Sequence, residues 1–135
     1  DYLRAFQFAK SYQKWSAFQR LGDTCWKLLE DPMLAEACYR KCMADFGGGW
    51  PGLQARVNLG ELLCELERYD DALACLDMPS LEGTWAAAML IGTAKVHGAA
   101  GRKPEAIAAI EKARATVGIM DHQKRECEAF LESLE

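Results

Sequence analysis

The feature that most constrains this chain is that no part of its sequence has the pattern of a β-strand. No stretch alternates apolar and polar residues with an enrichment of β-branched types, and no Asn-Gly or Asp-Gly hairpin turn occurs. Residues that favour helices dominate instead, namely Ala, Leu, Glu, Lys, Arg and Met. The sequence therefore predicts an all-α fold.

Helix-breaking and helix-capping residues divide the chain into segments. Asp31 followed by Pro32 is typical of a helix start, with Asp as the N-cap. The glycines at 47–49 end one helix, Pro79 ends and shortens another, and Asp121 caps the last. Short connections predict antiparallel neighbours. The expected helices are 2–12, 15–29, 32–46, 51–67, 69–77, 84–99, 104–117 and 121–134.

Length and charge exclude several classes of protein. A chain of 135 residues that is 50% hydrophobic can form one domain with a core that needs no metal or disulfide. The balance of 16 basic against 20 acidic residues gives no nucleic-acid footprint. No apolar run reaches the roughly 18 residues of a membrane span. The chain begins at Asp1 without a signal sequence, so we expect a processed or excised piece of a longer protein.

The cysteines and acidic residues give no sign of a metal site or of catalysis. No C-x-x-C pair is present, and the cysteines lie within helical patterns, so they are expected to be small buried side chains in a reducing, cytoplasmic compartment. Neither histidine has a partner motif, and phosphate-binding, dinucleotide and hydrolase motifs are missing. We therefore expect no enzyme, metal or cofactor. The cysteines are Cys25, Cys38, Cys42, Cys64, Cys75 and Cys127.

A short pattern of residues recurs along the chain. Leu-Gly pairs stand at 21–22 and 59–60. Three trios share internal spacings of 4 and then 3 residues, with 37 residues from the first to the second and 34 from the second to the third. Small residues at such positions let helices approach closely. The trios are Ala35, Tyr39 and Cys42; Ala72, Leu76 and Pro79; and Ala106, Ile110 and Ala113.

At these positions the chain resembles the tetratricopeptide repeat (TPR) family, clearest at 59–73 and at the turn 101–106. The resemblance covers about 15–118 and implies a right-handed α-solenoid of antiparallel helix hairpins in a single TPR-like domain, 1–135. Its expected parts are a lead-in helix at 2–12, repeats at 15–49, 51–83 and 84–118, and a capping helix at 121–134.

The resemblance also implies a protein-protein interaction module, a scaffold or adaptor that binds a peptide or helix of a partner in a concave groove. A groove that clamps a carboxylate is not expected, because only Asn58 matches that subclass of the family. Aligned on the family pattern, the groove residues are Gln19, Arg20, Asp23, Trp26, Lys27, Val57, Asn58, Glu61, Glu65 and Lys95.

Charge along the chain suggests which partner would bind. Residues 46–82 hold 2 basic and 7 acidic side chains, a local net charge of −5. We expect a partner with a basic segment opposite Glu61, Glu65 and Glu67, anchored by an apolar side chain near Trp26 or Val57. The alternative is an acidic face that is simply solvated.

Aromatic residues crowd the N-terminal stretch, at Tyr2, Phe6, Phe8, Tyr12 and Trp15. They cover more than one helical face, so part of them forms a candidate surface for a homodimer. An N-terminal helix followed by three repeats also resembles class II chaperones of type III secretion. A further alternative is an interaction domain of a larger enzyme or regulator.

Overall fold

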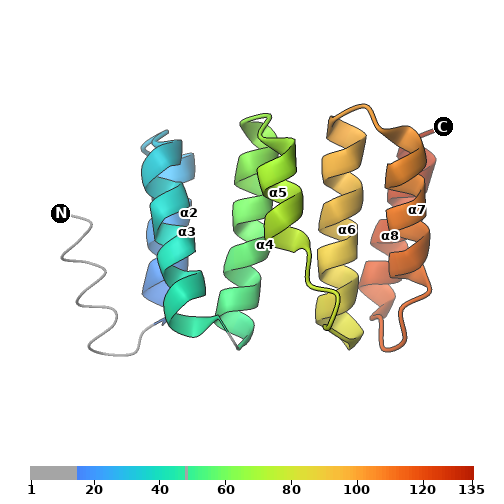
Figure 1. Cartoon of the computed structure of the whole chain (residues 1–135), viewed down its shortest axis with the longest axis horizontal. Helices are drawn as coiled ribbons and strands as arrows, with labels where there is room; N and C mark the ends of the chain where they lie inside the picture. The colour runs from blue at the N-terminus through green and yellow to red at the C-terminus, as the bar shows by residue number, and fades with distance from the viewer. Residues whose placement is uncertain (1–14, 48) are drawn as a thin grey trace. The chain divides into compact units, whose positions relative to one another are not determined.

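The computed structural model describes residues 15–47 and 49–135, and in these residues all regular structure is helical (Figure 1). This confirms the predicted all-α class. The predicted helix at 2–12 lies outside the described residues. The helices are α2 (Trp15–Lys27), α3 (Pro32–Phe46), α4 (Trp50–Glu65), α5 (Tyr69–Leu76), α6 (Gly83–Ala99), α7 (Lys103–Arg114) and α8 (Asp121–Ser133).

Local sequence signals account for three of the helix ends. Asp31 is the N-cap of α3, because its carboxylate accepts a hydrogen bond from the Leu34 N–H at 3.1 Å, and Pro32 opens the helix. Helix α3 ends at Phe46, directly before the glycines at 47–49. Helix α5 ends at Leu76, three residues before Pro79, so the predicted shortening of this helix is confirmed.

The predicted cap of the last helix is wrong. Helix α8 begins at Asp121, but its N-cap residue is Met120. The Gln123 side chain caps the helix instead, since its Oε1 accepts a hydrogen bond from the Met120 N–H at 3.1 Å. The Nε2 of Gln123 donates to the carbonyl oxygen of Thr84 at 3.0 Å. One buried amide therefore both starts α8 and attaches it to α6.

The chain divides into two compact units, and the boundary between them along the sequence falls between Leu62 and Leu63, near the end of α4. In unit 1, α2 packs against α3. In unit 2, α6 packs against α5, α7 and α8, and α7 packs against α8. The predicted division of a single domain into three repeats stays a prediction.

A close approach between backbone and ring joins α2 to α3. A Cβ at Gly22 would lie 2.6 Å from the ring of Tyr39, which is fully buried. The Tyr39 hydroxyl donates a hydrogen bond to the carboxylate of Asp23, the residue after Gly22 in α2. Glycine therefore makes room for the ring, and the hydrogen bond satisfies its buried hydroxyl.

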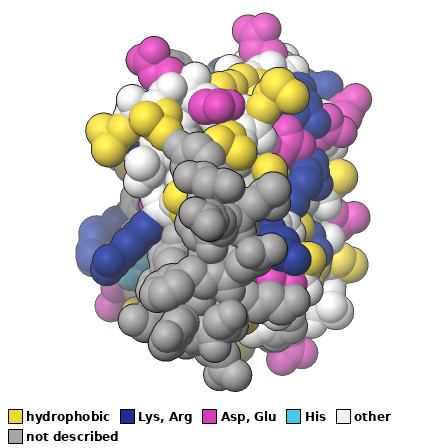
Figure 2. Space-filling view, turned by 90° about the vertical axis from the view of Figure 1, so that its left-hand side faces the viewer, with side chains coloured by type: hydrophobic (Ala, Val, Ile, Leu, Met, Phe, Trp, Pro, Cys, Tyr) yellow, Lys and Arg dark blue, Asp and Glu magenta, His cyan; other side chains and the backbone are white. Residues whose placement is uncertain are grey.

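Exposed apolar side chains gather where α2 turns into α3. Leu28, Leu29 and Met33 are all exposed there, Met33 by 82%. In Figure 2, hydrophobic side chains are visible near the top of the view. Glu30 in the same turn has a positive φ of 50°, a conformation that non-glycine residues adopt infrequently.

The core of unit 2 forms where α6, α7 and α8 meet. Its buried residues are Ile91, Ala94, Ile110, Ala113 and Cys127. The two alanines carry the smallest side chains of the set, which lets the helix axes approach closely. Among the described residues, none of the helices has both the length and the apolar character required to cross a membrane.

The recurring trios differ in burial. All members of the first and the third trio are completely buried. In the second trio, Ala72 and Leu76 are buried, whereas Pro79 is exposed beyond the end of α5. The pattern thus marks helix contacts in two places and a helix end in the third.

The cysteines are buried as free thiols, except that Cys64 is partly exposed. Burial raises the pKa of Cys38 to about 12 and that of Cys42 to about 11, and burial also raises the pKa of Cys127. Because the thiolate is the reactive form, these three thiols are inert in the folded chain.

We expect a thiol reagent such as Ellman's reagent at about pH 8 to modify Cys64 rapidly and the other cysteines only after unfolding. The measurement is the absorbance of released thionitrobenzoate with and without denaturant. In Cys64→Ser, the rapid phase should disappear. A rapid phase that survives in this variant would contradict the burial of the remaining thiols.

We expect Gly22→Ala to lower the free energy of unfolding by about 1–3 kcal/mol, because the added methyl group overlaps the Tyr39 ring. Helix propensity alone would raise stability by about 1 kcal/mol. Urea denaturation measures the change. Gly98→Ala is the comparison, since its Cβ would lie 3.2 Å from Phe130 and is therefore expected to cost less than the 2.6 Å overlap at Gly22. Equal effects of both changes would contradict the proposed overlap.

Candidate functional site: a groove along helix α6

Helix α6 is apolar on every side. Among its 17 residues, Lys95 is the one with a formal charge at pH 7. A helix of this composition needs partners around its whole circumference to be shielded from water. Helices α5, α7 and α8 all contact it, and Figure 1 shows α6 lying between α5 and α7.

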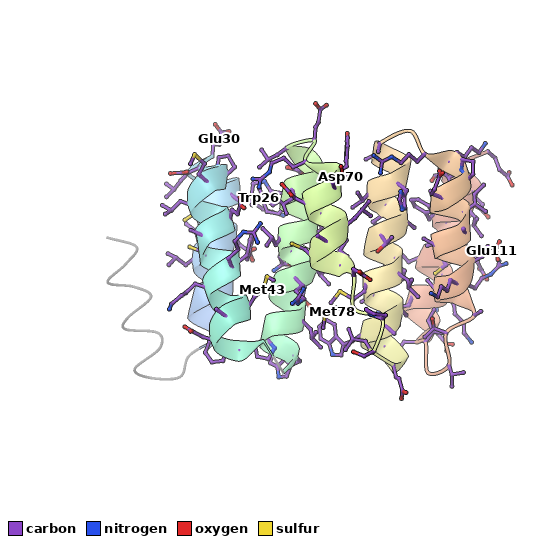
Figure 3. All side chains as sticks on the ribbon, in the orientation of Figure 1. Trp26, Glu30, Met43, Asp70, Met78 and Glu111 are labelled. Carbon is purple, nitrogen blue, oxygen red and sulfur yellow. The ribbon has the colours of Figure 1, made fainter. Side chains whose placement is uncertain are left out.

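The short length of α5 leaves part of α6 uncovered. At 1.5 Å per residue, the 8 residues of α5 extend about 12 Å, whereas the 17 residues of α6 extend about 25 Å. Beyond Leu76 the chain continues as the linker 77–82, which has no regular structure and runs beside α6 (Figure 3, Met78). A non-helical linker covers less of a helix than another helix does.

A groove of about 1130 Å³ results along α6. One stripe of α6 lines it, with residues spaced 3 or 4 apart on a single helical face. Helix α5 and the linker line one side, and the last turn of α7 with the residues after it lines the other. The lining residues are Leu73, Ala74, Leu76, Asp77, Met78, Pro79, Leu81, Glu82, Gly83, Ala86, Met89, Leu90, Thr93, His97, Lys112, Thr116 and Val117.

The groove is lined by apolar side chains together with polar and charged ones. Met78, Leu81 and Leu90 are partly buried, and Val117 is 90% exposed. Exposed charges stand at Asp77 and Glu82 in the linker. Predominantly apolar concavities with few polar groups are typical of binding sites.

His97 lies at the end of the α6 stripe and has an unsatisfied nitrogen. Its Nδ1 is buried without a hydrogen-bond partner among the described residues. The Oγ1 of Thr93, one turn earlier in the stripe, instead donates to the carbonyl oxygen of Met89 at 2.8 Å. An unpaired buried nitrogen lowers stability, and such atoms are infrequent in folded proteins.

The residues predicted for the concave surface on α2 belong to unit 1. Arg20, Asp23 and Lys27 are exposed, and Trp26 is partly buried. The Nζ of Lys27 lies 5.2 Å from the centre of the Trp26 ring, within reach of a cation–π interaction. The side chain of Gln19 lies outside the described residues. Asp23 is the acceptor for Tyr39, whose pKa is raised by burial and by this hydrogen bond.

The remaining predicted residues lie on α4 and α6. Val57 and Asn58 are partly buried, and the Asn58 side chain accepts a hydrogen bond from Gln54 at 3.1 Å. Glu61 and Glu65 are exposed. Lys95 forms an ion pair with Glu126 of α8 at 2.8 Å. None of the predicted residues lines the groove along α6.

Analysis of the sequence alone missed the groove, although two signals for it were present. The apolar run at 85–96 indicates a helix without a polar face, and Pro79 indicates a short helix before it. Together they predict an uncovered apolar stripe. Within the described residues, no group of three His, Cys, Asp or Glu side chains is placed to hold a metal ion.

Comparison of the chain with protein-family models, with curated proteins and with solved structures finds no match.

We expect His97→Phe to raise the free energy of unfolding by about 1 kcal/mol, because it replaces a buried unpaired nitrogen by carbon. Urea denaturation at neutral pH measures the change. His122→Phe, at an exposed position of α8, should stay within about 0.5 kcal/mol of the original chain. A loss of stability in His97→Phe would show that Nδ1 makes a favourable contact.

Proposed function

We propose that this chain is a protein-interaction module that binds an apolar segment of a partner protein in the groove along α6. The observation that carries this proposal is an apolar helix with one open face. The α6 stripe from Ala86 to His97 lines a groove of about 1130 Å³. Concave surfaces that expose an apolar helix face are typical places for a partner segment to bind.

The same packing supports a TPR-like arrangement, a right-handed α-solenoid of antiparallel helix hairpins. Gly22 contacts Tyr39 within the α2–α3 hairpin, and the trio Ala106, Ile110 and Ala113 is buried within unit 2. Repeat stacks of helical hairpins commonly present grooves to peptides. In this proposal the groove lies along the α5–α6–α7 face.

The length of the stripe limits what can bind. From Ala86 to His97 it extends about 16 Å along the helix axis. A partner segment of about five residues in an extended conformation, or about eleven residues in a helix, would span this distance. The apolar lining requires that two or three side chains of the segment are apolar.

A displayed library of random 12-residue peptides provides a probe. We expect peptides selected on the original chain to lose at least about tenfold in affinity for Ala86→Glu and for Ala74→Glu, since each places a charge in the groove. Ala108→Glu, at an exposed alanine of α7 outside the groove, is the matched control. Fluorescence anisotropy gives the Kd, and circular dichroism confirms folding.

Unchanged affinity in both groove variants, with both folded, would contradict binding in this groove. The proposal would also be contradicted if none of the selected peptides competed with one another for the groove.

A further inference from the structure

The two sides of the groove carry opposite charges. Asp77 and Glu82 stand on the linker side, and Lys112 stands on the α7 side. All three side chains are exposed. Among the residues that the structure describes, none of the three takes part in an ion pair.

Four other basic side chains of unit 2 are paired with a carboxylate within the chain. Each of four basic side chains has a carboxylate within 4 Å, two of them on the same helix end and two on a neighbouring element. Asp77, Glu82 and Lys112 thus differ from these four paired side chains. The pairs are Arg68–Asp71 at 3.0 Å, Lys95–Glu126 at 2.8 Å, Arg102–Asp70 at 3.8 Å and Arg114–Glu111 at 2.6 Å.

The linker holds its carboxylates in a defined place. Pro79 fixes one backbone angle of the linker, and the Leu81 N–H donates to the carbonyl oxygen of Met78 at 3.2 Å. The side chains of Met78 and Leu81 are partly buried. A linker fixed in this way loses little freedom when a ligand binds beside it.

We propose that the segment bound in the groove is amphipathic, with Lys or Arg on the edge that faces Asp77 and Glu82. Its middle is apolar against the α6 stripe, and its other edge is acidic toward Lys112. Opposite charges at the border of an interface select the partner and its orientation, while the apolar contacts supply most of the affinity. This inference rests on the proposed function and adds the chemistry of the partner.

The experiment repeats the selection of 12-residue peptides on the original chain and on the double variant Asp77→Lys/Glu82→Lys. We expect Lys and Arg to be enriched at least about threefold over the starting library on the original chain, and Asp and Glu to be enriched on the variant. A basic peptide from the first selection should bind the variant about tenfold more weakly.

The double variant Glu128→Lys/Glu132→Lys is the matched control. It changes the net charge by the same amount, at exposed positions of α8 outside the groove. It should keep the basic preference and the affinity of the original chain. Raising the salt concentration should weaken basic peptides on the original chain and leave apolar contacts intact.

Two outcomes separate this inference from the proposed function. Peptides that lose affinity for Ala86→Glu but show no basic preference would overturn the inference and leave the function standing. An equal loss in the α8 control would also overturn it, because net charge would then explain the effect. If no selected peptide responds to Ala86→Glu, the proposed function itself fails.

Discussion

Unit 2 depends on the close packing of neighbours around an apolar helix. Helix α6 has no polar face, so α5, α7 and α8 must approach it closely enough to exclude water. Glycine makes two of these approaches possible. A Cβ at Gly92 would lie 3.2 Å from Leu76 of α5, and one at Gly98 would lie 3.2 Å from Phe130 of α8. Toward α7, Ala94 and Ala113 are fully buried and carry a single methyl group each.

The groove follows from this packing because α5 is too short to complete it. The exposed part of the stripe also contains side chains too small to fill the space, namely Ala86 and Thr93. Larger side chains there would have closed the groove and stabilised the unit by burying more apolar area. The sequence instead leaves apolar surface in contact with water, a cost that a bound partner would remove.

Features set by neighbouring residues could be predicted from the sequence, and features set by distant ones could not. The Asp31 cap and the end of α3 at Phe46 each depend on residues within one turn. The cap of α8 depends on Gln123, whose amide is also held by Thr84, 39 residues earlier. The groove also depends on both kinds of residue. Pro79 predicts the early end of α5, which opens one side of the groove, whereas the other side is formed by Lys112 and Val117, which lie more than 30 residues later in the chain.

The positions of the charges follow from the same geometry. The linker contains a turn, closed by the hydrogen bond from the Leu81 N–H to the carbonyl oxygen of Met78 at 3.2 Å, and this turn sets which of its side chains are covered. Met78 and Leu81 are partly buried, while Asp77 and Glu82 stay exposed beside the groove. A longer α5 would have covered the stripe and removed these carboxylates from its edge. The early end of α5 therefore has two consequences. It leaves the groove open, and it places negatively charged side chains on one side of it.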